Sequence, residues 1–213
     1  MGGIPFFSSL LSLIYLGITN SIIIIIWLPT AYLRNILFFI LAFVIGAWMA
    51  NYFIRGHFSV LLHEFKHSFI SGLVGNKFEG YKIRKNHGHF EYKYSKETKK
   101  YNALIALAPY FLPVFTVPVW LISGLIFADS PARALMLIGV AYGADCALNY
   151  RDIGPHQTDF TNLTGGYWIG IFFVTMMNLT ILTMVLAWVI GQNHGLKFLF
   201  YSHFLFWRNF FGI

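Results

Sequence analysis

The sequence has little charge and almost no cysteine. Asp, Glu, Lys and Arg make up 11% of its 213 residues, whereas 57% are hydrophobic and 19% are aromatic. Soluble domains typically carry about 25% charged residues, so the chain is too apolar for that class. Its composition predicts an integral membrane protein, with room for about six spans of roughly 20 residues and no sizeable soluble domain.

The single cysteine, Cys146, excludes an intramolecular disulfide and a metal site built from several thiolates. Lys and Arg are also absent before the first apolar run, and no small-residue cleavage site follows that run. A removable signal peptide therefore fits poorly, and we expect residues 5–28 to be a retained span. We interpret 1–213 as one membrane domain.

Apolar runs separated by polar turns predict the fold class, an all-α polytopic membrane protein of about six transmembrane helices. Pro113 and Pro118 are expected to kink the fourth span. The aromatic tail at 191–213 suits a location along the membrane interface. The predicted spans cover residues 5–28, 35–54, 57–75, 103–127, 132–148 and 167–190.

Residues 76–101 differ from the spans because they are polar and basic. Alternation over 89–94 and a turn signal at 86–88 predict a short β-hairpin, with a solvated charged loop as the alternative. Eight of the fifteen Lys and Arg residues fall here, which is typical of a cytosolic segment and does not indicate nucleic-acid binding, despite the net charge of +7. Counting spans from the hairpin puts Arg34 and 149–166 on the cytosolic side and both termini outside.

An ionisable cluster interrupts the third predicted span. His63, Glu64 and His67 have the spacing His-Glu-x-x-His, and ionisable groups in a membrane helix mark functional sites by default. Residues four apart share a helix face, so both imidazoles can bind one ion. Zinc suits imidazole, and a glutamate beside the first histidine can accept a proton from zinc-activated water. The motif predicts His63 and His67 as ligands and Glu64 as general base.

The same helix carries a polar stripe that we expect to face protein and to end at a glycine on the cytosolic side. Lys66 lies off the stripe, and either pairing with a carboxylate or extension toward the interface would accommodate it. Without a metal, the two histidines would be buried and hydrogen-bonded, with Glu64 paired to Lys66 or an arginine. The stripe consists of Ser59, His63, His67, Ser71 and Gly75.

A hydrolytic zinc site needs a third protein ligand. The three other glutamates all lie in the basic loop, so an aspartate or a histidine must serve. Asp145 lies inside an apolar helix and suits a contact behind the ligands or between helices. Asp152 and His156 flank a Gly-Pro turn. We favour Asp159, at the start of the last apolar segment, with His156 and Asp152 as alternatives.

Several segments together resemble site-2-protease-type intramembrane metalloproteases. They are HEFKH on a membrane helix, the β-like residues 88–92, the run Ala-Pro-Tyr-Phe-Leu-Pro at 108–113, and His-Gln-Thr-Asp at 156–159. The resemblance implies that His63, His67 and Asp159 hold zinc and that Glu64 activates water to cut a transmembrane helix. The chain departs from the family in two ways. Phe160 follows Asp159, where the family commonly has glycine, and the chain has no room for a regulatory domain. The resemblance therefore implies a minimal, divergent member.

We therefore expect a membrane-embedded zinc endopeptidase with one Zn²⁺ per chain. Its partners would be the lipid bilayer and the helix of a membrane-protein substrate, and its active site would face the cytosolic side. The alternative is a catalytically inactive membrane protein that uses the same histidines, either a pseudoprotease that binds helices or a metal carrier.

Overall fold

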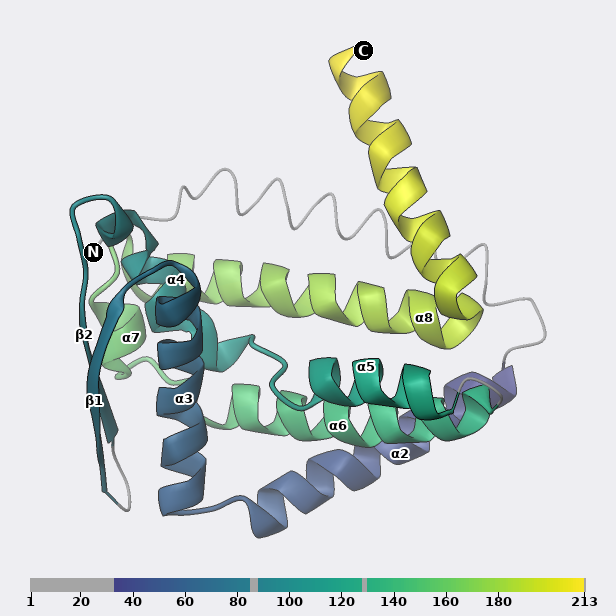
Figure 1. Ribbon diagram of the computed structural model, residues 1–213, viewed down its shortest axis with the longest axis horizontal. Helices are drawn as coiled ribbons and strands as arrows, with labels where there is room; N and C mark the ends of the chain where they lie inside the picture. Colours follow the sequence, from purple (N-terminus) through teal and green to yellow (C-terminus); the bar gives the residue numbers. More distant parts are fainter. Residues whose placement is uncertain (1–32, 85–87, 128–129, 213) are drawn as a thin grey trace.

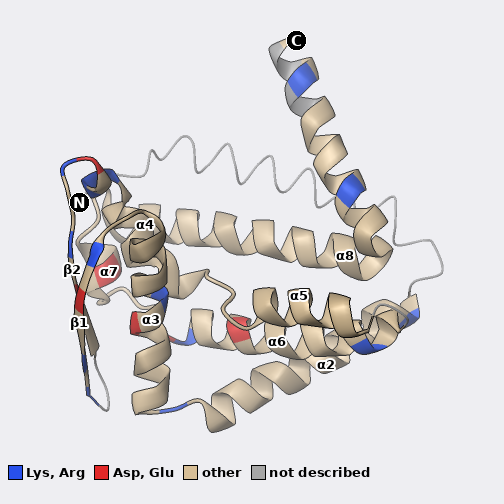
Figure 2. Ribbon diagram, viewed as in Figure 1, with Lys and Arg blue, Asp and Glu red and all other residues tan. Residues whose placement is uncertain are grey.

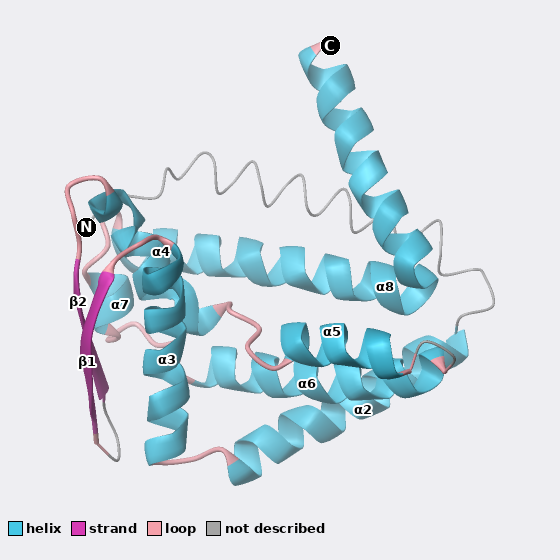
Figure 3. Cartoon of the chain, in the orientation of Figure 1, coloured by secondary structure: helices cyan, strands magenta, loops and turns pink. Residues whose placement is uncertain are grey.

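The computed structural model describes residues 33–84, 88–127 and 130–212, so the predicted span at 5–28 and the centre of the hairpin turn lie outside the described residues. The described chain is mostly helical, with one two-stranded antiparallel sheet (Figure 3). In chain order the elements are α2 (Leu33–Phe53), α3 (His57–Leu73), β1 (Lys77–Ile83), β2 (Gly88–Lys93), η1 (Thr98–Tyr101), α4 (Asn102–Leu107), η2 (Ala108–Tyr110), α5 (Thr116–Ile126), α6 (Pro131–Arg151), α7 (Thr158–Thr161) and α8 (Gly166–Phe211).

The elements fall into two groups (Figure 1). α2, α5, α6 and the first part of α8 run along the long axis and form a helix bundle. Its core includes Phe39 of α2, Ile138 of α6 and Val185 of α8. α3, the two strands, α4 and α7 gather at one end of this bundle, which we call the hairpin end. α3 runs across the direction of α6 and α8 rather than alongside them (Figure 1).

Three helices of the described chain are long and apolar enough to cross a membrane, namely α2, α6 and the Gly166–Leu205 part of α8. Large apolar side chains such as Leu41 and Trp48 are exposed on α2, as expected of a surface covered by lipid. Six spans are not shown. α3 has 17 residues, which at 1.5 Å per residue gives about 26 Å, less than the hydrocarbon core of about 30 Å.

Because α3 crosses the bundle, the helices before and after it do not alternate in direction as predicted. The guanidinium of Arg151, at the end of α6, donates to the carbonyl of Ile54 just after α2, at 2.8 Å. α2 and α6 therefore both finish at the hairpin end, and α2 begins at the opposite end (Figure 1). Arg34, in the first turn of α2, is thus not on the side of the hairpin, contrary to the prediction, because α3 does not carry the chain back along the bundle. Residues 149–166 do lie at the hairpin end.

The predicted hairpin is confirmed. β1 and β2 pair in antiparallel register from Lys77 opposite Lys93 to Ile83 opposite Gly88. α3 packs against both strands. It ends near Gly75 as predicted, because Gly75 adopts φ 83° and the amide of Asn76 donates to the carbonyl of Ser71 at 3.0 Å.

The predicted fourth span is broken rather than kinked. α4 and η2 end at Tyr110, and α5 begins only at Thr116. Pro113 has no amide hydrogen, so the carbonyl of Pro109 lacks its helical partner. Pro118 breaks nothing, because it lies in the first turn of α5, where a proline is tolerated.

Buried side chains from three helices bind the backbone groups that this break leaves free. Lys66 of α3 donates to the Pro109 carbonyl at 3.2 Å, and Asn178 of α8 donates to the Tyr110 carbonyl at 2.8 Å. On the other side of the break, the Asp145 carboxylate of α6 accepts the amides of Phe115 and Thr116 at 3.1 and 2.7 Å. Asp145 is therefore a contact between helices.

The tail predicted at 191–213 continues α8 after a bend. Gln192 interrupts the helical backbone with φ 50° and ψ −135°, and the chain then turns away from the bundle (Figure 1). Gly195 lies so close to the Ala187 carbonyl that a Cβ would overlap it. Beyond this bend the tail is helical again, as far as Phe211.

Glycines bring α2 and α6 into close contact. A Cβ at Gly143 of α6 would overlap the carbonyl oxygen of Phe43, and one at Gly46 of α2 would overlap that of Val140. Small residues allow such close approach between membrane helices, where the hydrophobic effect adds little to association.

We predict that Gly143→Val separates α2 from α6 and destabilises the protein. Forcing extra methyl groups into a packed contact costs about 1–3 kcal/mol, and the thermal midpoint in detergent should fall. Gly124→Ala is the matched control, because a Cβ at Gly124 of α5 meets no atom within 4 Å, and it should leave the midpoint unchanged or slightly raised. Equal midpoints for the two variants would contradict the close helix contact.

Candidate metal centre

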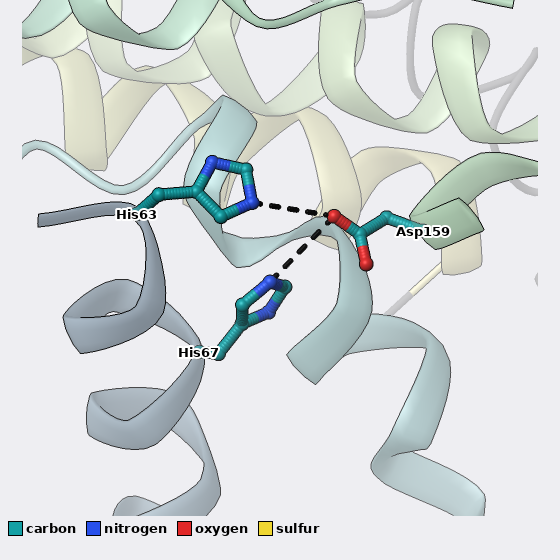
Figure 4. Close-up of side chains that lie close together, drawn as sticks. All are labelled: His63, His67 and Asp159. Carbon is teal, nitrogen blue, oxygen red and sulfur yellow. Dashed lines mark hydrogen bonds and ion pairs between the residues drawn. The ribbon is translucent and has the colours of Figure 1, made fainter. Parts of the chain in front are cut away.

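Two histidines and an aspartate come together at the hairpin end (Figure 4). His63 and His67 lie one turn apart on α3, with ring centroids 5.0 Å apart. The Nε2 atoms of His63 and His67 lie 3.4 and 3.6 Å from Oδ2 of Asp159. One ligand atom from each of the three residues lies within 4.8 Å of the others, so the cluster could hold a metal ion.

The spacing suits a small ion with short bonds. In tetrahedral zinc with bonds of about 2.0–2.1 Å, neighbouring ligand atoms are about 3.3 Å apart. The two contacts to Asp159 are within a few tenths of an ångström of that separation. Two imidazoles and one carboxylate also leave a fourth position free for water or substrate.

Asp159 is brought to the histidines by α7. This single helical turn is anchored by Phe160, which is fully buried, with its ring centroid 4.5 Å from that of Tyr110. The aromatic residue that follows Asp159, where the resembling family commonly has glycine, thus fixes α7 against η2.

Polar contacts on the far side of each ring orient the histidines. Nδ1 of His67 lies 2.7 Å from the carbonyl oxygen of Ile105. A carbonyl only accepts, so Nδ1 carries a proton, and Nε2 is the ring nitrogen that faces Asp159 and could bind a metal. Nδ1 of His63 lies 3.4 Å from Oδ2 of Asp152. A carbonyl or carboxylate behind a ligating histidine is the usual arrangement in metal sites.

The candidates for the third ligand are therefore separated in space. Asp159 faces both Nε2 atoms, whereas Asp152 lies behind His63. His156 is exposed and does not line the cavity at the cluster. Asp145 is engaged at the start of α5.

Tyr110 was not singled out from the sequence. Its hydroxyl donates to Oδ2 of Asp159 at 2.9 Å, and its ring lies edge-on to that of His63. The only sequence signal was its position between two prolines, in the run at 108–113.

A cavity of about 450 Å³ opens at the cluster. Glu64 lines it together with His63, His67 and Asp159, and is only 6% exposed. Gly88 of β2 leaves room for Glu64, because a Cβ there would lie 2.7 Å from its carboxylate oxygen Oε1. The general base predicted from the sequence thus shares one water-accessible space with the three candidate ligands.

Lys66 pairs with a side-chain amide and a backbone carbonyl rather than with a carboxylate, and it is buried rather than extended to the surface. Its ammonium donates to Oδ1 of Asn149 at 2.5 Å and to the Pro109 carbonyl at 3.2 Å. It lies on α3 between the histidines but lines no part of the cavity. Glu64 is therefore not neutralised by Lys66.

The charges of the cluster favour ionised carboxylates. Burial alone would raise the pKa of Asp159, but hydrogen bonds and charge from His63 and His67 outweigh it and lower the pKa. Burial likewise opposes ionisation of Asp152, while contacts with His63 and Arg151 lower its pKa below the ordinary value.

No protein-family model, curated protein sequence or solved structure matches the chain. Its fold and function are therefore inferred from its own residues.

We predict an acid-dependent loss of stability that depends on Asp159. Its pKa in the folded protein is lowered, so its contribution is present above the unfolded pKa of about 4 and is lost as the pH falls below it. With a chelator present, the thermal midpoint of Asp159→Asn should be below wild type at pH 7, and the gap should narrow below about pH 4. A gap that is constant over this range would contradict the ionised contact.

Proposed function

We propose that the protein is a zinc-dependent intramembrane endopeptidase that cuts a transmembrane or membrane-proximal peptide bond of a membrane-protein substrate. One observation carries this proposal: Nε2 of His63, Nε2 of His67 and Oδ2 of Asp159 converge, with Glu64 lining the same cavity. The resemblance of HEFKH and Asp159 to site-2-protease-type metalloproteases supports it.

The residues divide the chemistry between them. Zinc held by His63, His67 and Asp159 would supply a Lewis acid that polarises the scissile carbonyl and lowers the pKa of water to about 7. Glu64, beside the first histidine, accepts the proton of the attacking water and passes it to the leaving amine. The contacts of Tyr110 and Asp152 hold the ligands in orientation.

The membrane setting limits access of water to the cavity. Three apolar helices support a membrane protein, and the prediction of about six spans stays a prediction. We propose that the hairpin end faces the cytosol, because Lys and Arg concentrate there, while few mark the opposite end of the bundle (Figure 2).

Metal analysis of the purified protein tests the proposal. Wild type should contain close to one zinc per chain. His63→Ala and Asp159→Ala should lose zinc or bind it more weakly, because each removes a ligand, and Glu64→Gln should retain zinc without peptidase activity. His156→Ala is the matched control, since its exposed side chain lies away from the cavity, and it should retain zinc.

The outcomes separate the alternatives. Unchanged zinc in Asp159→Ala would move the third ligand elsewhere. Wild type without zinc would favour a cluster of buried, hydrogen-bonded histidines with no metal function.

A second experiment distinguishes a protease from a protein that only binds helices or carries metal. We predict that Glu64→Gln co-purifies with an uncleaved membrane protein, whereas wild type releases shorter products of the same protein. The difference arises because the glutamine cannot accept the proton of water. An inactive helix-binding protein would instead retain the same intact partner in both forms, as shown by mass spectrometry of the bound material.

A further inference from the structure

Lys66 is a buried cation that the proposed chemistry does not use. It is 2% exposed and lies between the two histidines of α3. A buried ammonium is costly unless it is fully partnered, and in a membrane protein it marks a functional position by default. Its partners therefore indicate what it does.

One partner exists because of the proline break. Pro113 has no amide to donate to the Pro109 carbonyl, and the Lys66 ammonium donates to it at 3.2 Å. The next residue, Tyr110, donates its hydroxyl to Asp159. Lys66 thus ties α3, which carries the two histidines, to the segment that orients the third candidate ligand.

The other partner, Asn149, takes part in one of three side-chain contacts between α3 and the end of α6; another of them joins Arg151 to Ser59. Lys66 donates to Asn149 at 2.5 Å, and His63 lies 3.4 Å from Asp152. His63 and Lys66 are three residues apart on α3, and Asn149 and Asp152 are three residues apart at the end of α6. Residues at this spacing share a helix face. The buried Lys66–Asn149 contact therefore helps to fix the register in which Asp152 meets Nδ1 of His63.

We propose that Lys66 is a positioning residue that sets the metal affinity of the His63, His67 and Asp159 site. It acts by holding the end of α6 and the proline break against α3. The inference rests on the proposed metal site and explains the lysine within HEFKH. Asn149, which is also 2% exposed, is its essential acceptor.

Two substitutions remove the Lys66–Asn149 contact from either side. Lys66→Met keeps most of the side-chain length without the ammonium, and Asn149→Leu removes the acceptor. Each should weaken zinc binding by about 10–100-fold, the usual effect of losing an outer contact of a metal site. The double variant should bind zinc only slightly more weakly than the single variant with the lower affinity, because both substitutions remove the same contact.

Asn149→Asp and Thr116→Val are the controls. Asn149→Asp keeps an acceptor for Lys66 and should restore zinc binding to about that of wild type. Thr116→Val removes a buried hydrogen bond of 2.7 Å to Asp145 elsewhere on the broken segment, so it should lower the thermal midpoint and leave zinc affinity unchanged.

The readouts are the zinc Kd, by competition with a chromophoric chelator, and the visible absorption of bound Co²⁺, which reports ligand geometry. If Lys66→Met lowers the thermal midpoint but leaves the zinc Kd and the Co²⁺ spectrum as in wild type, the inference is wrong, while the proposed metal site is unaffected. If Lys66→Met does not fold, Asn149→Leu decides by the same two readouts. Wild type that binds neither metal would overturn the proposed function itself.

Discussion

A single constraint organises this protein: polar groups buried among apolar helices must find partners within the protein. The proline break after Tyr110 frees backbone groups in the middle of the apolar chain. Lys66, Asp145 and Asn178, from α3, α6 and α8, each bind one side of that break. The Lys66 and Asn178 contacts hold α3 and α8 against the segment that carries Tyr110, whose hydroxyl donates to Asp159, whereas the Asp145 contacts fix the start of α5.

The candidate site combines three firmly held side chains that could bind a metal with a carboxylate that lines the same cavity. The far nitrogen of His67 is held by the Ile105 carbonyl and that of His63 by Asp152, so both Nε2 atoms are directed toward Asp159. Glu64 lines the cavity next to them, with Gly88 leaving space for its carboxylate. Side chains fixed from behind, with a carboxylate in the adjoining cavity, are the arrangement that the proposed hydrolysis would require.

The local features were predictable from sequence because short-range spacing determines them. Two histidines four residues apart must share a helix face, Gly75 is suited to end a helix, and alternation over 89–94 specifies strands. Asp159 was favoured because it lies next to the start of the last apolar segment, on the side of the membrane to which the motif was assigned, and it is the candidate that meets both histidines.

The features that were missed depend on tertiary packing. An apolar composition cannot reveal that α3 crosses the bundle, so Arg34 was assigned to the wrong end. Asp152 and Tyr110 contact the candidate ligands only because α6, η2 and α7 converge on them in the folded chain. The lysine within HEFKH looked out of place because its acceptors, Asn149 and Pro109, lie 83 and 43 residues away along the chain.

X-ray absorption spectroscopy of the zinc-loaded wild-type protein measures the central claim most directly. The expected spectrum has a first shell of nitrogen and oxygen ligands at about 2.0–2.1 Å, with outer scattering from two imidazole rings. A spectrum without paired imidazole scattering, or a purified protein that takes up no zinc, would contradict the assignment of His63, His67 and Asp159 as a metal centre.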